Sequence, residues 1–474
     1  RDRISNYNNP KADSIAFAIK YLHENSIDYK RALEIIKSIH INPTFTAHPT
    51  ETKRNSLIDK QRRVLSLVEK LLDKNINQKE DQAIRLEVLR LCKLILGTDD
   101  VRSRRVSINE EIENVIKNTI NSLWHAVPLL AEDMESAFVH FYGKKIDIHE
   151  FLSFQTWVGG DRDGNPNVTF KISEYAVVSL IKHLIFMYNE DIDLLFNDYS
   201  ISLRQPKKDC PLHHSIETDL KKSNISKEVI DRYEFEPIRL KLLLIKEKLK
   251  EYEQSINQRK NIKFTVEDFQ IDLTLIKDFL KNYTGDELLA NGDIQKLITR
   301  VKIFGLHFMS LDIRQHSSVH ENAVEEIISS ISPKFSYIKA GESERCEILK
   351  KLILTDIIEL DFDSNNLSNQ LKEVLDTFLF IKNSIILNKR IISSYIISMT
   401  DSKSDILEVV FLSKITGIVK FKNKKISSKL KIVPLYETIS DLKNAPKLLE
   451  ELINDDLYNS IICNHSNFQE VMLG

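Results

Sequence analysis

The chain has 474 residues, of which 67 are Lys or Arg and 69 are Asp or Glu, so its formal net charge is only −2. This balance argues against a nucleic-acid partner, which needs a basic excess, and a hydrophobic share of 42% argues against general disorder. The four cysteines form no C-x-x-C pair, and we find neither a membrane-spanning apolar run nor a signal peptide. Together these features predict a cytoplasmic location with no membrane partner.

Helical periodicity dominates the chain. Apolar residues recur every three or four positions, as in Ile15, Ile19 and Leu22, which is typical of amphipathic helices. With only 11 Gly and 11 Pro, few residues interrupt such helices. The pattern predicts helices over residues 13–39, 57–72, 84–96, 111–130, 173–197, 238–254, 266–282, 321–331 and 442–453.

Short apolar segments of another kind lie between the helical stretches, and each is followed by polar or charged residues. They cover residues 43–47, 154–158, 303–313, 394–399 and 432–435, and they predict strands. In barrels of alternating strands and helices, the active site lies at the carboxyl ends of the strands. The sequence therefore predicts a mostly α protein with an α/β (TIM-like) barrel, enlarged by many long helices.

Three polar segments separate parts of this pattern. They are residues 203–230, which include Pro206 and Pro211, and residues 361–370 and 421–429. No Gly/Ser-rich or Pro-rich hinge divides two cores, so we interpret these segments as surface loops. Residues 1–474 are predicted to belong to a single domain.

The segment Thr46-Ala47-His48-Pro49-Thr50-Glu51 follows the first predicted strand. Pro49 biases His48 toward an extended backbone, and imidazole is the side chain whose proton is mobile near neutral pH. A lone histidine is more often structural than catalytic, so this local argument leaves both roles open.

A second polar segment, residues 157–167, reads Trp-Val-Gly-Gly-Asp-Arg-Asp-Gly-Asn-Pro-Asn. Its Asp-x-Asp-Gly motif resembles the start of a calcium loop. An EF-hand, however, needs Gly at loop position six and Glu at position twelve, where this chain has Pro166 and Ile172. Taken alone, the segment is a tight turn with charged tips.

Two charged residues follow later strands. Arg314 follows the apolar run that ends at residue 313, and Glu437 follows the strand predicted at 432–435. An arginine at a strand end can pair with a core aspartate, and a carboxylate after a short strand can cap the next helix. Local sequence alone assigns neither residue to chemistry.

Four segments together resemble the phosphoenolpyruvate carboxylases of the bacterial and plant type. They are residues 46–51, residues 157–167, residues 311–317 (Leu-Asp-Ile-Arg-Gln-His-Ser) and residues 433–439 (Val-Pro-Leu-Tyr-Glu-Thr-Ile). Weaker matches between them occur in family order, so the resemblance covers nearly the whole chain.

The resemblance implies a reaction and a role for four residues. Phosphoenolpyruvate and bicarbonate would give oxaloacetate and phosphate, by way of carboxyphosphate and the enolate of pyruvate. His48 would be the catalytic general base, and Arg314 a catalytic residue that binds the substrate phosphate through its guanidinium fork. Trp157 would line a substrate pocket that holds carbon dioxide, and Glu437 would be a ligand of Mg²⁺ or Mn²⁺.

The resemblance also implies an effector site. In some family members a basic region after the histidine signature helps to bind a sugar-phosphate activator. The matching residues here are Lys53, Arg54 and Arg102, while Asn55 departs from the usual pattern. Family members are homotetramers, so a homotetramer is expected for the full-length protein.

The two ends of the chain look cut. Residue 1 is Arg, and Val471-Met472-Leu473-Gly474 matches the first four positions of a second family signature. That signature continues Tyr-Ser-Asp-Ser-x-Lys-Asp in the family, and its first Asp is the second metal ligand. We therefore expect the N-terminal and central part of an enlarged barrel, which is incomplete, inactive by itself and prone to aggregate.

Two alternatives remain at this stage. If its gene ends near Gly474, the chain is a degenerate remnant or a binding partner of an intact paralogue. A different enzyme of phosphate-ester metabolism would need a Gly-rich phosphate loop, and the sequence contains neither a Walker motif nor a Rossmann fingerprint.

Overall fold

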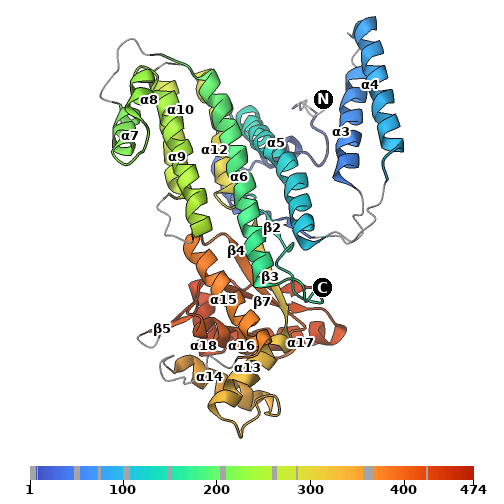
Figure 1. Cartoon of the computed structure of the whole chain (residues 1–474), viewed down its shortest axis with the longest axis vertical. Helices are drawn as coiled ribbons and strands as arrows, with labels where there is room; N and C mark the ends of the chain where they lie inside the picture. Colours follow the sequence, from blue (N-terminus) through green and yellow to red (C-terminus); the bar gives the residue numbers. More distant parts are fainter. Residues whose placement is uncertain are drawn as a thin grey trace.

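The structure is a computed structural model. It describes residue 7 and residues 9–46, 54–72, 76–99, 107–147, 151–202, 210–258, 264–283, 285, 287–355, 367–422 and 425–474. Long helices form the upper part of the molecule, and a curled sheet with shorter helices around it forms the lower part (Figure 1). In the part described, no helix is long and apolar enough to cross a membrane.

The sheet has six parallel strands in the order β1-β2-β3-β4-β7-β8. Their bounds are β1 Thr44–Phe45, β2 Gln155–Thr156, β3 Ser310–His316, β4 Ile392–Ser398, β7 Lys431–Tyr436 and β8 Met472–Leu473. The register pairs Thr156 with Leu311, Arg314 with Ile396, and Leu435 with Met472. Because the strands are parallel, their carboxyl ends meet at one edge, which confirms the predicted incomplete α/β barrel.

Helices make up most of the chain, as predicted. Their bounds are α1 Ile15–Glu24, α2 Tyr29–Ser38, α3 Asn55–Leu71, α4 Gln78–Leu96, α5 Ile108–Tyr142, α6 Phe170–Asp198, α7 Pro211–Leu220, α8 Lys227–Arg232, α9 Pro237–Gln258, α10 Val266–Tyr283, α11 Glu287–Ala290, α12 Asp293–Phe304, α13 Ser317–Ile331, α14 Glu342–Leu354, α15 Asn369–Leu387, α16 Lys403–Ile415, α17 Ile439–Ile453 and α18 Asp456–Asn464.

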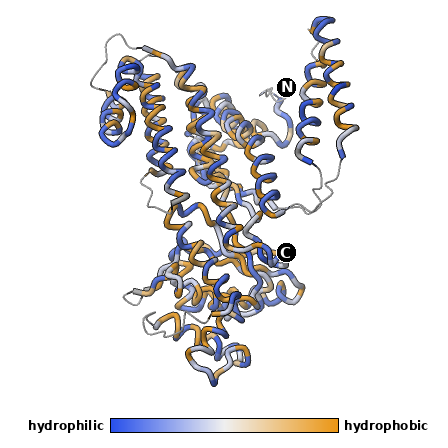
Figure 2. Tube along the Cα trace, viewed as in Figure 1, coloured by the Kyte–Doolittle hydropathy of each residue, from blue (hydrophilic) through white to orange (hydrophobic). Residues whose placement is uncertain are grey.

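The core follows from the apolar stripes of these helices, which Figure 2 shows beside polar stripes on the same elements. On α6, Val177, Leu180 and Leu184 are buried at helical spacing. Trp124 of α5 stacks on Phe304 of α12 with ring centroids 5.5 Å apart. One cluster of buried apolar residues extends from the first helix to α18, so the helical part and the barrel share a core.

A buried charge network joins α7, α9 and α10. Lys241 has 0% side-chain exposure, and its Nζ lies 2.6 Å from Asp219 and 2.5 Å from Asp272. Lys248 contacts the same two carboxylates at 2.7 and 2.8 Å. Two lysines and two aspartates therefore neutralise one another, which buried charges require.

Several sequence predictions need correction. Residues 203–230 are not only a surface loop, because they contain α7 and the first four residues of α8. Pro211 is the first residue of α7, where proline is tolerated. The predicted helix over 13–39 is two helices, since Asp28 caps a new one. The strand expected within residues 303–313 begins only at Ser310, because residues 303–304 still belong to α12, which ends at Gly305 with φ 58°. The predicted loop over 421–429 contains part of a hairpin, β5 (Lys420–Lys422) and β6 (Lys425–Ser427).

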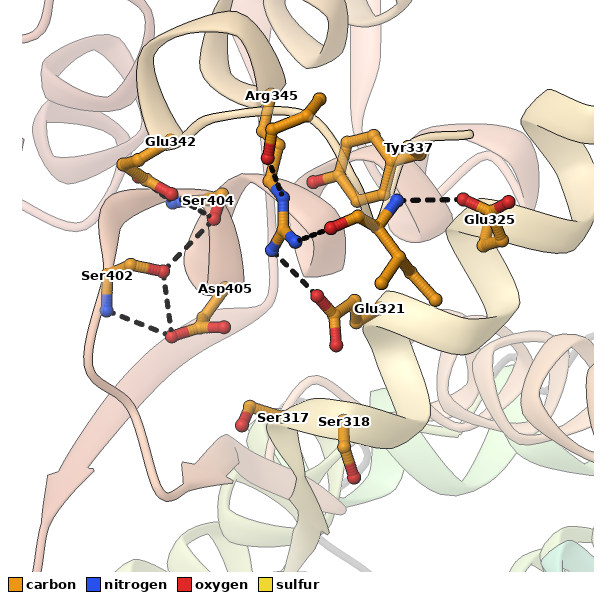
Figure 3. A network of polar contacts seen from close by, with 12 residues as sticks. Ser317, Ser318, Glu321, Glu325, Tyr337, Glu342, Arg345, Ser402, Ser404 and Asp405 are labelled. Carbon is orange, nitrogen blue, oxygen red and sulfur yellow. Dashed lines mark hydrogen bonds and ion pairs between the residues drawn. The ribbon is translucent and has the colours of Figure 1, made fainter. Parts of the chain in front are cut away.

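A polar cluster fixes the helix that follows β4. Glu342 of α14 accepts hydrogen bonds from the Ser404 backbone N–H at 2.9 Å and its hydroxyl at 2.6 Å (Figure 3). Asp405 accepts from the Ser402 backbone N–H at 3.0 Å. Free N–H groups at the start of α16 are thus satisfied by two carboxylates, one of them from α14. This anchors α16 directly after the carboxyl end of β4.

Candidate active site

Arg314 lies at the centre of the candidate site, at the carboxyl end of the sheet. Its Nη2 donates to Asp163 Oδ2 at 2.7 Å and to Glu437 Oε1 at 2.8 Å, and its Nε lies 3.8 Å from Asp161 Oδ1. Only 15% of the Arg314 side chain is exposed. Three carboxylates from two segments therefore surround one mostly buried guanidinium, so its positive charge is fully paired.

The loop after β2 carries two of these carboxylates and pairs with β3. The Arg162 backbone N–H donates to the Arg314 carbonyl at 2.9 Å, and the Arg314 N–H donates to the Gly160 carbonyl at 3.0 Å. The buried Arg162 guanidinium donates to Gly160 O at 3.0 Å and to Ser173 Oγ of α6 at 2.8 Å. These bonds hold the loop between β3 and α6.

Gly160 lets this loop lie directly against β3. A Cβ atom at this position would lie 2.0 Å from the Asp312 backbone oxygen. Gly160→Ala is therefore expected to displace the loop and to lower the free energy of unfolding by about 3 kcal/mol. Urea denaturation measures this change.

Gly97→Ala is the matched control for that substitution. A Cβ atom on Gly97 would meet Lys93 O at 3.6 Å, an ordinary contact distance. We expect a change within about 0.5 kcal/mol for this exposed position. Equal effects of the two substitutions would contradict the close approach of the loop to β3.

Trp157 lies between Arg314 and the barrel interior. Its indole Nε1 donates to Asp312 Oδ2 at 3.2 Å, and the Arg314 guanidinium lies 5.6 Å from the ring centroid. The ring packs against Ile396, Val433 and Leu435, which form a small apolar cluster inside the sheet. Trp157 thus has an apolar side and a cationic neighbour.

A cavity of about 400 Å³ opens beside Trp157. Its lining combines apolar and acidic side chains and includes Thr46, Ile108, Glu111, Val158, Asp161, Asp163 and Val168. Burial raises the pKa of Asp161, and the nearby Arg314 charge opposes this rise. Burial also raises the pKa of Glu111. Asp161 and Asp163 line the cavity and contact Arg314, so a small anion in the cavity reaches Arg314 only beside these two carboxylates or in place of one of them.

Comparisons with known proteins identify the family of the chain. The sequence profile of the family "Phosphoenolpyruvate carboxylase" matches residues 1–474. The chain belongs to the phosphoenolpyruvate carboxylase family. It is 29% identical to the phosphoenolpyruvate carboxylase of Rhodothermus marinus over 98% of this chain, and 31% identical to that of Prochlorococcus marinus (strain MIT 9515) over 93%. It spans about half the length of these relatives, 50% and 47% respectively.

Three of the residues that the family resemblance singled out come together. Trp157 directly follows β2, Arg314 lies in the carboxyl-terminal half of β3, and Glu437 directly follows β7. Arg314 contacts the other two residues. His48 lies outside the described residues, but Thr46, two positions before it, lines the cavity. Their chemical roles stay predictions.

Of the three predicted effector residues, the structure describes only Arg54. Lys53 and Arg102 lie outside the described residues. Arg54 precedes α3, and its Nη2 lies 3.4 Å from Asp99 Oδ2 beyond the end of α4. Arg54 therefore belongs to the base of the α3–α4 hairpin, which stands apart from the other helices in Figure 1.

The carboxylates near Arg314 are the side chains of this site that suit Mg²⁺ or Mn²⁺. Among the residues that the structure describes, no group of three or more His, Cys, Asp or Glu forms a cluster suited to a metal ion. Glu437 shares the Arg314 Nη2 with Asp163, so these two carboxylates lie close together. Mg²⁺ often uses only one or two carboxylates and takes its other ligands from substrate and water. Glu437 fits that open type of site.

Sequence reasoning missed two members of the cluster. Asp161 and Asp163 were assigned to a charged turn, yet both face Arg314. Asp163 and Arg314 are 151 positions apart, so only the order of the strands brings them together. The Asp-x-Asp spacing was the available signal, because a turn in which the Asp163 N–H donates to Asp161 Oδ1 at 3.1 Å keeps the two carboxylates together.

Proposed function

We propose that the protein carboxylates phosphoenolpyruvate with bicarbonate and releases oxaloacetate and phosphate. The observation that carries the proposal is that Arg314 contacts both Glu437 and Trp157, next to a cavity that Trp157 lines, in a chain of this family. A cation, a carboxylate and an apolar wall are the elements that a reaction between phosphoenolpyruvate and carbon dioxide needs.

Arg314 binds the phosphoryl group in this proposal. Its Nη2 contacts Asp163 and Glu437, while its Nε has no hydrogen-bond partner in the described structure, so the substrate phosphate binds beside these carboxylates or in place of one of them. A guanidinium fits two phosphate oxygens through parallel hydrogen bonds. As bicarbonate attacks phosphorus and the enolate of pyruvate departs, Arg314 stabilises the charge on the transferred group.

His48 acts in the second step. It accepts the proton of the carboxyl group of carboxyphosphate, and the C–O bond to the phosphate breaks to give carbon dioxide and phosphate. The enolate carbon then attacks carbon dioxide and forms oxaloacetate. Trp157 lines the pocket that holds carbon dioxide and excludes water, which would otherwise protonate the enolate.

Glu437 is the proposed ligand for Mg²⁺ or Mn²⁺ in the described part of the chain. When bound, the ion supplies a positive charge that stabilises the enolate oxygen. Lys53, Arg54 and Arg102 are proposed to bind a sugar-phosphate effector. A cytoplasmic homotetramer is the proposed setting of the whole protein.

The 474 residues by themselves are proposed to be inactive, because they span about half the length of the relatives. The experiment therefore fuses this chain to the part of the Rhodothermus marinus carboxylase that it does not match. We expect the fusion enzyme, but not the chain alone, to form oxaloacetate from phosphoenolpyruvate and bicarbonate with Mg²⁺.

His48→Asn in the fusion enzyme separates the two steps. We expect bicarbonate-dependent release of phosphate to continue while oxaloacetate formation falls about 100-fold or more, since general-base catalysis contributes about 10²–10⁴. Unchanged oxaloacetate yield would contradict the role of His48. A folded fusion enzyme that releases no phosphate would contradict the proposed function and favour a non-catalytic remnant or a binding partner of an intact paralogue.

A further inference from the structure

Asp312 is a buried carboxyl group next to the site that the proposed reaction does not use. It lies two residues before Arg314 on β3, so both side chains project from the same face of the strand. Asp312 is 3% exposed, and its Oδ2 accepts the Trp157 indole N–H at 3.2 Å. Its Oδ1 has no hydrogen-bond partner in the described structure.

The surroundings of Asp312 do little to favour a charge. Burial raises its pKa to about 7 and Glu470 adds to the rise, while the Trp157 hydrogen bond, the Ser394 backbone N–H and Lys431 oppose it. No cation forms an ion pair with Asp312 among the described residues. The nearby cluster of Ile396, Val433 and Leu435 is apolar, so a leucine would suit this interior better. Among the described side chains, the Trp157 indole is therefore the hydrogen-bond donor to the Asp312 carboxyl group.

The other tryptophan of the chain provides an internal comparison. Trp124 Nε1 donates to Asp191 Oδ1 at 3.2 Å, and the Arg300 guanidinium lies 4.9 Å from the Trp124 ring. There Arg300 also binds Asp191, at 2.5 Å, which closes a triangle inside the helical part. A tryptophan, an aspartate and an arginine also meet around Trp157, but among the described ion pairs none joins Arg314 to Asp312.

The two tryptophan sites differ in the carboxylates that the neighbouring arginine binds. Arg314 lies near the face of Trp157, yet it binds Asp163 and Glu437 rather than Asp312. Asp312 thus contacts the edge of the Trp157 ring. The face of the ring contacts Arg314, whose guanidinium binds Asp163 and Glu437. Without the Asp312 acceptor, the indole would keep its apolar contacts but lose its directional bond.

We propose that Asp312 is a positioning residue that orients the Trp157 indole beside the cavity and thereby supports Arg314. In the proposed reaction, which this inference builds on, the ring so held forms a fixed wall of the carbon dioxide pocket. Asp312 itself touches neither substrate nor the reacting atoms.

The first test measures the indole N–H of Trp157 in the 474-residue chain. The chain has two tryptophans, so a ¹⁵N-indole label gives two signals, and Trp157→Phe assigns them. In Asp312→Leu we expect the Trp157 signal to shift and its N–H to exchange with solvent about tenfold faster or more, since a hydrogen bond to a carboxylate is lost. Asp312→Asn keeps an acceptor oxygen and should restore slow exchange.

The Trp124 signal reports whether each variant is folded, and Asp191→Asn is the matched control. We expect Asp191→Asn to move the Trp124 signal and leave that of Trp157 in place. If Asp312→Leu leaves the Trp157 exchange rate unchanged, or if Asp312→Asn disturbs it as much as Asp312→Leu does, the proposal is wrong. A loss of the Trp124 signal identifies an unfolded variant. In that case the exchange rate of the Trp157 indole N–H in Asp312→Asn, measured at lower temperature, decides the question.

The second test separates this inference from the proposed function. In the fusion enzyme, Asp312→Leu should lower the yield of oxaloacetate per phosphate released about tenfold, with pyruvate in its place, and Asp312→Asn should recover most of it. Equal yields in all three proteins would overturn the catalytic part of the proposal. An inactive fusion enzyme would refute the proposed function instead. The indole measurement would still show whether Asp312 orients the Trp157 ring.

Discussion

Arg314→Ala in the fusion enzyme is expected to lower kcat/KM for phosphoenolpyruvate by about 10²–10³, the usual cost of removing one group that stabilises transition-state charge. The guanidinium is the cation to which Asp163 and Glu437 bind, at 2.7 and 2.8 Å. Without it, these carboxylates repel one another and also repel an incoming phosphate. Steady-state kinetics with varied phosphoenolpyruvate measures the effect.

Arg314→Lys is the matched variant, because it keeps the positive charge and loses the fork. A lysine is a point charge that cannot form two parallel hydrogen bonds to a phosphate, so activity should lie between wild type and alanine. Alanine and lysine variants that both retain wild-type kcat/KM would show that Arg314 only neutralises its carboxylate neighbours. Equal, complete losses would point to structural damage, which circular dichroism checks.

Much of the barrel could be predicted from local sequence. Strands such as β4 and β7 are short apolar runs with polar residues after them, and this pattern reflects burial of the strand and exposure of its carboxyl end. Helix boundaries were harder. Pro211 was interpreted as part of a loop, whereas at the first position of α7 its missing N–H costs nothing.

The contacts of the site could not be predicted in this way. Glu437 and Arg314 are 123 positions apart, and their 2.8 Å contact depends on the order in which β3, β4 and β7 pair. The family resemblance named these two residues but not Asp161, Asp163 or Asp312. An aspartate inside an apolar strand gives no local sign of the indole that it will meet from β2.

The second large effect is expected at Glu408, a fully buried glutamate of α16 with 0% exposure. Its Oε1 accepts the Tyr337 hydroxyl at 2.8 Å, and its Oε2 has no partner in the described structure. Burial raises the pKa of Glu408 from 4.5 to about 9, and Asp405 nearby adds to the rise. Tyr337 and Asp405 belong to the polar cluster in Figure 3.

The sign of the pH dependence follows from these values. Between pH 4.5 and about 9 the folded protein retains a proton on Glu408 that the unfolded chain has lost. The free energy of unfolding therefore falls as pH rises through this window, by up to about 1.4 kcal/mol per pH unit. Below pH 4.5 both states are protonated, and the contribution no longer changes.

Glu408→Gln should remove this dependence, because the amide has nearly the shape of the protonated acid and does not ionise. We expect the variant to match wild type at pH 5 to within about 1 kcal/mol and to exceed it by about 2–4 kcal/mol at pH 8. Urea denaturation at pH 5, 6, 7 and 8 measures the difference, with Glu450→Gln on the exposed side of α17 as the control.

The pH dependence, rather than the stability at one pH, distinguishes the two interpretations of Glu408. If the carboxyl group were ionised in the fold, glutamine would remove a charged acceptor from Tyr337, and the variant would be the less stable protein at pH 8. If it is protonated, the difference between variant and wild type grows with pH, because only the wild-type protein must retain a proton against the solvent. A constant difference from pH 5 to 8 would exclude the raised pKa, whatever its sign.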